Sequence, residues 1–374
     1  MKIVIVQGAF FPVPPLQGGA VEKIWYRLGH EFATFGHCVI HISKRHPQLA
    51  NKEFKSGVNY IRVSGYEAPS SLLKLKTLDL LYTFRAIREI PIDSDIIVTN
   101  TFWAPILIKS KLKKKVYISV ERVPKGQMRF YGKVAAYRGC SLSICKSITE
   151  ELPMALEELI TYVPNPVPFT IRKELLKKEK QKVILFVGRI HPEKGIDVLI
   201  NAFKKLPESV KKVWKLNIVG PFLEKEGGAG PRYLNHLKKN IKNENIEFSG
   251  PIFIENSLAE LYALSSIFVY PAQEGSGDAA PVSPREAMAY GSVPIVSELA
   301  CFNDFIVNDE NGVYFNHKSK NQESELASKI LSLIENQRLL ETLKSEALKI
   351  GDTFSINAIA KRFINDFTRI NKKE

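Results

Sequence analysis

Four charged side chains in the second half of the sequence have types and spacings that suit a phosphorylated ligand. Arg189 and Lys194 follow an apolar run at 183–188, and a planar guanidinium and an ammonium group both suit a diphosphate. Asp278 and Glu286 are separated by seven residues further along the chain. An ionised carboxylate only accepts hydrogen bonds, so each can hold hydroxyl groups of a ligand. We therefore expect these four residues to share one binding site.

Two strands position these residues. Residues 267–270 are apolar and β-forming, the run stops at Pro271, and helical residues resume at Pro284 and end at Gly291. Ligands of open parallel sheets bind outside the carboxyl ends of the strands, which places residues 274–286 at such an edge. The free N–H groups of a helix start also favour a phosphate.

Alternating strand and helix patterns predict a parallel sheet in each half of the chain. A Gly/Pro-rich loop at 8–19 and a helix at 20–35 follow the first strand, periodicity is lost from 162 to 182, and an amphipathic helix covers 355–370. We expect an α/β protein of two Rossmann-like, doubly wound domains. The expected strands are 2–6, 39–42, 58–63, 96–98, 116–120 and 141–144, then 183–188, 216–219, 246–248, 267–270 and 293–296.

Two motifs resemble those of the retaining GT-B glycosyltransferases of family 4, the glycosyl transferases group 1. Residues 286–296, Glu-Ala-Met-Ala-Tyr-Gly-Ser-Val-Pro-Ile-Val, are similar to the second half of its acidic motif, and residues 188–195 match its Gly-Arg-x-x-x-x-Lys-Gly signature. The resemblance implies the GT-B fold, with two domains facing a cleft. Residues 1–167 and 355–374 would form the acceptor domain, to which the last helix crosses back, and residues 168–354 the nucleotide-sugar domain.

The resemblance also implies an activity: transfer of a hexose-type sugar from a nucleotide sugar, with retention of anomeric configuration. The acceptor would be a glycan or a lipid-linked acceptor in surface polysaccharide or glycoconjugate assembly. The donor would be a substrate, with a UDP-sugar favoured, and no cofactor is implied. No metal is implied by the resemblance either.

The roles of the site residues follow from the same resemblance. Arg189 and Lys194 would stabilise the leaving diphosphate, Glu286 would bind the ribose, and the first acid of the motif would contact the donor sugar. Asp278 is favoured for the first acid, because its spacing and Pro281 fit the family's variants, while Glu274 lies twelve positions before Glu286 and is the alternative. Further candidate donor contacts are Gly18 and Gly19, which resemble a family phosphate loop, Ile252 in the base-reading segment, and Pro281, Val282 and Ser283 at the helix start.

The acceptor side departs from the family pattern. The family often has a His after the fifth strand, where this chain has Glu121 and Arg122. We expect Glu121, Arg122 and Lys125 to contact the acceptor or a donor phosphate. The alternative is membrane docking by a helix face carrying Lys125, Arg129 and Lys133.

The charge is strongly basic and uneven. The 374 residues carry a formal net charge of +14, and residues 1–167 hold 23 Lys and Arg against 13 Asp and Glu. Residues 109–138 contain ten basic residues and one acid, which suits a solvated face, an anionic lipid surface or an acidic acceptor. No nucleic-acid-binding signature accompanies the charge, so nucleic acid is not an expected partner.

The sequence contains no signal-peptide pattern and no run of eighteen uncharged apolar residues, and its four cysteines form no Cys-x-x-Cys pair. We expect a cytoplasmic protein, with peripheral attachment to the inner face of the membrane as an extension. Two alternatives remain open, a GT-B nucleotide-sugar epimerase and a non-catalytic basic protein that binds membranes or nucleic acid. A nicotinamide dehydrogenase is disfavoured because residues 7–19 lack Gly-x-Gly-x-x-Gly.

Overall fold

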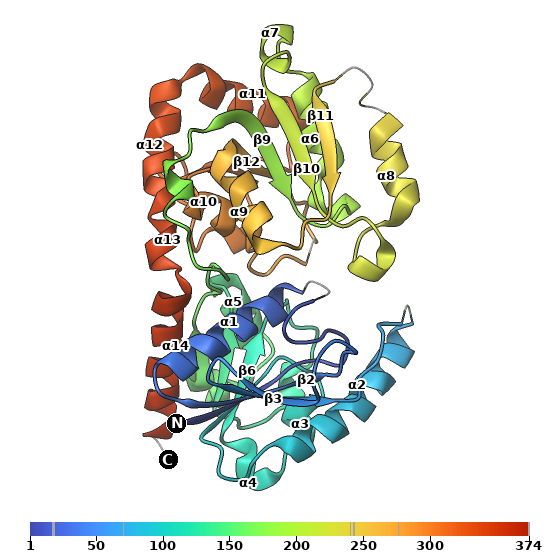
Figure 1. Ribbon diagram of the computed structural model, residues 1–374, viewed down its shortest axis with the longest axis vertical. Coiled ribbons are helices and arrows are strands. Elements are labelled where there is room, and N and C mark those ends of the chain that lie inside the picture. The colour runs from blue at the N-terminus through green and yellow to red at the C-terminus, as the bar shows by residue number, and fades with distance from the viewer. Residues whose placement is uncertain (17–18, 70, 240, 242–243, 276, 373–374) are drawn as a thin grey trace. The chain divides into compact units, whose positions relative to one another are not determined.

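The computed structural model describes residues 1–16, 19–69, 71–239, 241, 244–275 and 277–372 (Figure 1). The chain divides into two compact units. The first comprises Met1–Pro168 and Ile356–Glu374, and the second comprises Phe169–Ser355. These boundaries differ by one residue from those expected at 167/168 and 354/355.

The first unit is built on an eight-stranded sheet in the order β3-β4-β2-β1-β5-β6-β7-β8. Among the described residues, β3 with β4 is its only antiparallel pair. The central strands are buried on both faces, which explains their continuous apolar sequences. The strands are β1 Lys2–Val6, β2 Cys38–Lys44, β3 Lys52–Lys55, β4 Val58–Val63, β5 Ile96–Thr99, β6 Val116–Val120, β7 Ala136–Gly139 and β8 Ile160–Tyr162.

The helices of the first unit include the last helix of the chain, α14, which lies beside α1 (Figure 1). Trp25 and Phe363 have ring centroids 5.2 Å apart, and Phe32 and Phe367 lie 5.8 Å apart. The expected return of the C-terminal helix to the first unit is therefore confirmed. The helices are α1 Ala20–Thr34, α2 Leu72–Ala86, α3 Ala104–Leu107, α4 Ser110–Lys113, α5 Leu142–Thr149 and α14 Ile356–Asn371, with 3₁₀ turns at Ile87–Glu89, Met128–Phe130 and Met154–Leu159.

The second unit has a six-stranded sheet, parallel throughout the described residues, in the order β11-β10-β9-β12-β13-β14. Its strands are β9 Gln181–Val187, β10 Lys215–Val219, β11 Ile246–Gly250, β12 Ser265–Tyr270, β13 Val293–Ser297 and β14 Val313–Phe315. Its helices are α6 Ile196–Lys204, α7 Glu208–Lys211, α8 Gly230–Lys239, α9 Glu255–Leu264, α10 Ser283–Ala289, α11 Gln322–Glu335, α12 Gln337–Leu348 and α13 Ile350–Thr353, with 3₁₀ turns at Leu175–Lys177, Pro192–Lys194, Glu224–Glu226 and Ala300–Phe302.

Both sheets reverse their direction of winding near the middle. In the second unit, β9, β10 and β11 proceed toward one edge, and the chain then returns to place β12 beside β9 and continue to β14. Because parallel crossovers are right-handed, the helices before and after this reversal cover opposite faces of the sheet. The two doubly wound α/β units expected from the sequence are confirmed. No helix in the described part of the chain is both long and apolar enough to cross a bilayer.

Two local predictions are wrong. The strand expected at 141–144 is the start of α5, where the Ile144 N–H group donates to Ser141 Oγ at 3.3 Å, a typical helix N-cap. The strand lies just before it, at Ala136–Gly139, where the buried Arg138 obscures the apolar pattern. The helix face expected from Lys125 to Lys133 is absent as well, since the only helical turn there is 3₁₀ and covers Met128–Phe130.

Candidate active site in the second unit

The two motif loops of the second unit follow neighbouring strands. The first loop follows β9 and contains residues 188–195, and the second follows β12 and contains residues 271–282. Since β9 and β12 are hydrogen-bonded neighbours at the point where the winding reverses, both loops leave the sheet at its switch point. Open α/β sheets bind ligands at this position.

Lys194 and Asp278 form the centre of the site. Lys194 Nζ lies 2.7 Å from both Asp278 Oδ1 and Asp278 Oδ2, and the two side chains are 3% and 14% exposed. Tyr270, the last residue of β12, donates its hydroxyl to Asp278 Oδ2 at 3.4 Å, and Lys194 Nζ lies 5.7 Å from its ring centroid. Burial, and secondly the Asp278 carboxylate, raise the pKa of Tyr270 well above its ordinary value, so this phenol stays protonated.

Gly195 allows the two loops to approach each other closely. It has φ 63°, in the left-handed region, and a Cβ atom there would lie 2.1 Å from the Pro271 carbonyl oxygen. Beside it, the Gln273 N–H group donates to the Glu193 carbonyl at 2.9 Å. The loops are thus joined through their backbones, which fixes Lys194 relative to Asp278.

Arg189 lies on the exposed side of the same loop. Its Nη2 donates to Glu193 Oε1 at 2.6 Å and its Nη1 to the Gly227 carbonyl at 2.9 Å, and its side chain is 44% exposed. Glu193 Oε1 also lies 3.5 Å from Lys194 Nζ. Arg189 and Lys194 therefore belong to one charge network, of which Lys194 is the buried member.

Glu286 lies in the first turn of α10 and is almost completely buried. Its Oε2 accepts a hydrogen bond from the Tyr262 hydroxyl of α9 at 2.8 Å. Burial, followed by the Glu286 charge, raises the pKa of Tyr262 well above its ordinary value, so the phenol remains a donor. Lys180 braces the same region, because its Nζ donates to the carbonyls of Tyr262 at 3.0 Å and Tyr290 at 2.7 Å.

Glu274 lies in a different setting from Asp278. Its carboxylate pairs with Lys318 at 2.6 Å, and both side chains are exposed. The hydrogen bond from Lys318 holds the pKa of Glu274 below its ordinary value. The structure therefore brings Asp278, and not Glu274, to Lys194.

The remaining donor candidates in this unit lie in loops. Pro281 is buried, whereas Val282 and Ser283 are half-buried, and Ser283 is the first residue of α10. Ile252 is half-buried in the loop after β11.

The candidate site residues of the first unit lie in different surroundings. Gly19 caps α1 with φ 96°, and a Cβ atom there would lie 2.3 Å from Glu22 Oε2, so the Glu22 carboxylate folds against the cap. Burial raises the pKa of Glu22, while the positive charge of Arg122 opposes the shift. Gly18 lies outside the described residues. Arg122 and Lys125 are exposed.

Glu121 takes part in a buried ion pair. Its Oε1 lies 2.6 Å from Arg138 Nη1 and accepts the Ser119 hydroxyl at 2.7 Å, while its Oε2 accepts from Asn165 Nδ2 at 2.9 Å. The side chains of Glu121 and Arg138 are 7% and 0% exposed. These contacts give Glu121 a structural role, which the sequence reasoning missed because Arg138 lies on the next strand of the sheet.

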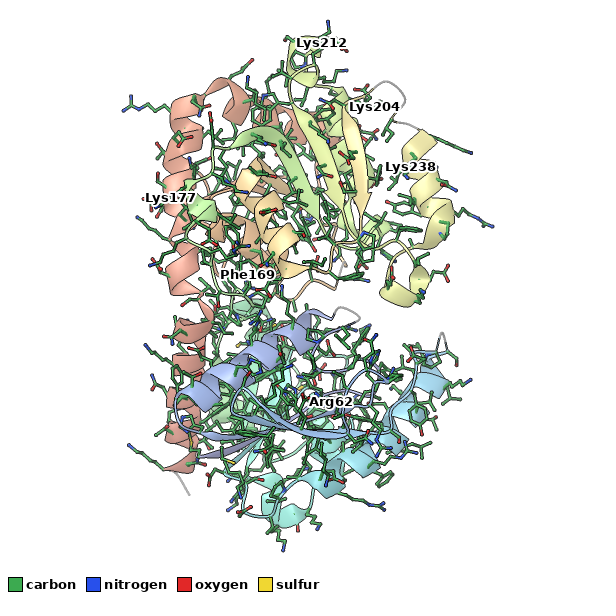
Figure 2. The ribbon with its side chains drawn as sticks, in the orientation of Figure 1. Arg62, Phe169, Lys177, Lys204, Lys212 and Lys238 are labelled. Carbon is green, nitrogen blue, oxygen red and sulfur yellow. The ribbon has the colours of Figure 1, made fainter. Side chains whose placement is uncertain are left out.

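Sequence reasoning also missed Tyr262, Tyr270 and Lys180. A partial signal existed for Tyr270, since it ends an apolar strand directly before the acidic segment. For Tyr262 and Lys180 no local signal existed, because their partners lie 24 or more residues away in the chain. Lys204, Lys212 and Lys238 of this unit are solvent-exposed and labelled in Figure 2, whereas Lys194 is almost completely buried, which is unusual for a lysine.

Residues 168–350 match the family described as glycosyl transferases group 1, and this range includes both motif loops. The second unit is a group 1 glycosyltransferase domain. A 200-residue segment of the chain is 28% identical to the uncharacterized glycosyltransferase MJ1069 of Methanocaldococcus jannaschii. This alignment covers 53% of the chain and 48% of MJ1069, so the chain matches about half the length of that relative.

Solved structures extend the likeness of the fold beyond the group 1 glycosyltransferase domain to the whole chain. Sucrose-phosphate synthase from Thermosynechococcus elongatus has a TM-score of 0.80 at 17% identity, covering 100% of both chains. Anabaena Alr3699/HepE in complex with UDP and glucose has a TM-score of 0.75 at 15% identity, covering 99% of this chain and 100% of HepE. The chain therefore has the GT-B fold of glycosyltransferases, as the sequence motifs implied.

Proposed function

We propose that the protein transfers a hexose-type sugar from a nucleotide sugar to a glycan or lipid-linked acceptor, with retention of anomeric configuration. The observation that carries the proposal is the contact of Lys194 with Asp278, which joins the two motif loops of a group 1 glycosyltransferase domain at the switch point of its sheet. Retention rests on the resemblance of the acidic segment to that of the retaining enzymes.

Arg189 and Lys194 suit the diphosphate of the donor. Negative charge develops on the leaving diphosphate as the glycosidic bond breaks, and fixed cations stabilise that charge most effectively in a site that excludes water. Lys194 is held by its surroundings, whereas Arg189 is half-exposed and can reorient toward a ligand. We therefore assign Lys194 the larger share of transition-state stabilisation.

Asp278 and Glu286 suit the hydroxyl groups of the donor. Asp278 lies beside Lys194, so a sugar bound there would meet the carboxylate while its phosphate meets the ammonium group. Glu286 would bind the ribose with the carboxylate oxygens that its hydrogen bond from Tyr262 orients. The favoured donor is a UDP-sugar, in keeping with the UDP and glucose bound to HepE. The proposal assigns no role to a cofactor or a metal.

Thermal-shift measurements with UDP-, GDP- and dTDP-glucose test the donor class, because a ligand of the folded state raises the melting temperature. We expect a shift with at least one of them, and with the UDP-sugar above all. We expect it to disappear in Lys194→Ala. The same shift in Lys194→Ala as in the parent protein would refute the assignment.

The two candidate first acids provide a matched pair for the transfer reaction. Asp278→Ala should reduce transfer more than Glu274→Ala, because Asp278 contacts Lys194 while Glu274 contacts Lys318 at the surface. The opposite ranking would transfer the role to Glu274. Analysis of the products separates the alternative reactions, since an epimerase would yield an epimerised sugar without an acceptor.

A further inference from the structure

We propose that the outer face of α2 in the first unit binds the surface of an anionic lipid bilayer. This inference goes beyond the proposed function, because it concerns the first unit and requires no sugar nucleotide. The sequence offered a helix face carrying Lys125, Arg129 and Lys133 for membrane docking, but the structure has only a 3₁₀ turn there. The present proposal assigns membrane docking to α2 instead.

Helix α2 exposes large apolar side chains along its length. Leu72 and Leu73 are 78% and 79% exposed, and Leu81 and Phe84 are 44% and 42% exposed. The side that packs on the sheet is also apolar in part, with Ala86 fully buried. α2 therefore carries apolar residues on its solvent-facing side as well as on its buried side, and an exposed group of large apolar side chains indicates a binding surface.

The charges on this helix favour an anionic surface. Lys74 and Lys76 are exposed among the leucines, while the only acid of the helix, Asp79, is half-buried. Burial raises the pKa of Asp79 to about 6, which lowers its negative charge in mildly acidic conditions. Lysines beside exposed leucines suit the lipid interface, where the apolar stem lies against the acyl chains and the ammonium group meets the headgroups.

Aromatic contacts, of which Tyr131 is a buried member, connect α2 with the 3₁₀ turn Met128–Phe130 of the basic segment 109–138. Lys76 Nζ lies 5.1 Å from the ring centroid of Phe102, whose own ring lies 6.3 Å from that of Tyr131. The preceding residue, Phe130, is 59% exposed, and the guanidinium of Arg129 lies 5.4 Å from its ring centroid. An exposed aromatic residue with an adjacent cation thus extends the same apolar and basic pattern beyond the helix.

The positive charge decides between a bilayer and a second copy of the chain as the occupant. A two-fold interface centred on α2 would bring Lys74 and Lys76 toward their own counterparts, which like-charge repulsion opposes. Headgroups of an anionic bilayer instead neutralise these lysines. Such attraction falls off within a Debye length, so binding should depend strongly on salt.

Co-sedimentation of the full chain with vesicles tests the proposal. We expect binding to vesicles of phosphatidylcholine with phosphatidylglycerol, weak binding to phosphatidylcholine alone, and loss of binding as salt is raised. Lys74→Gln with Lys76→Gln should weaken binding about twenty-five-fold, from roughly fivefold for each charge removed. Leu72→Ser with Leu73→Ser should weaken it more than tenfold, because each leucine contributes by entering the interface.

The control is Met154→Ser, because Met154 is 84% exposed in the same unit but lies outside α2. This variant should bind vesicles as the parent does, and the α2 variants should keep the parent's melting temperature and its thermal shift with UDP-glucose. Equal vesicle binding by parent and α2 variants, or none by the parent, overturns the proposal. A different result would be a dimer of the parent in light scattering that Leu72→Ser with Leu73→Ser dissociates. If the parent also fails to bind vesicles, this face of α2 is assigned to a second copy of the chain.

Discussion

Replacing Lys194 by Met should destabilise the second unit while leaving it folded. The variant removes the ammonium group that lies 2.7 Å from both Asp278 oxygens and leaves a carboxylate that is only 14% exposed. Removing one member of a buried ion pair costs about 3–5 kcal/mol, mainly because the other charge remains buried and unpaired. Since part of the Asp278 side chain reaches solvent, we expect the lower end of that range, about 3 kcal/mol.

A second variant separates two effects of Lys194→Met, the loss of the attraction between Lys194 and Asp278 and the cost of leaving the Asp278 charge buried. Lys194→Met combined with Asp278→Asn removes both charges, so it should be more stable than Lys194→Met alone by about 2 kcal/mol. Neither variant should transfer sugar, because each lacks residues proposed to bind the donor. Stability and activity should therefore change independently across the pair.

Hydrogen exchange measured by mass spectrometry is the suitable assay, since the chain has two units and one global unfolding midpoint would not isolate the second. Peptides covering β9 at Gln181–Val187 and β12 at Ser265–Tyr270 report on the second unit, and β1 peptides at Lys2–Val6 serve as the internal control. Protection of β9 and β12 should fall in Lys194→Met and partly recover in the double variant. A loss below about 1 kcal/mol, or a double variant less stable than the single one, would refute the reasoning.

Three further predictions concern buried charges elsewhere in the two units. Glu286→Gln retains an oxygen for the Tyr262 hydroxyl, so the melting temperature should change little while the thermal shift with UDP-glucose is lost; an unchanged shift would remove Glu286 from the donor site. Burial lowers the pKa of Lys180 to about 7 from 10.5, so between these values the unfolded chain holds a proton that the folded chain has released. Stability should therefore rise with pH across that window, by up to about 1.4 kcal/mol per unit, and Lys180→Met should flatten the profile in pH-dependent melting curves. Glu121→Gln leaves the fully buried Arg138 without its anion and should cost about 3 kcal/mol in hydrogen exchange of the first unit, whereas a neutral effect would favour an acceptor-binding role.

The architecture could be predicted from the sequence wherever strands are continuously apolar. Residues 3–6 of β1 and residues 267–270 of β12 are buried on both faces, and these runs are continuously apolar or aromatic. The prediction failed at β7, because Arg138 interrupts the apolar run and is neutralised by Glu121 from the neighbouring β6 segment. Short edge strands such as β3 and β8 were missed as well, since three or four residues, none of them fully buried, give no clear periodicity.

The contact between Lys194 and Asp278 that defines the candidate site depends on the order of strands in the sheet. Neither sequence motif by itself indicates that order. Lys194 and Asp278 lie 84 residues apart in the sequence and meet because β9 and β12 are neighbours in the sheet. Each loop is recognisable by itself, but only their adjacency distinguishes Asp278 from Glu274 as the partner of Lys194. Pairing of Glu274 with Lys318 directs that carboxylate away from Lys194, and Gly195 allows no larger residue between the loops. The acidic segment 274–286 therefore has two parts, an exposed part at Glu274 and Gly275 and a part from Asp278 onward that contacts the β9 loop through Lys194, and the donor site should include the second.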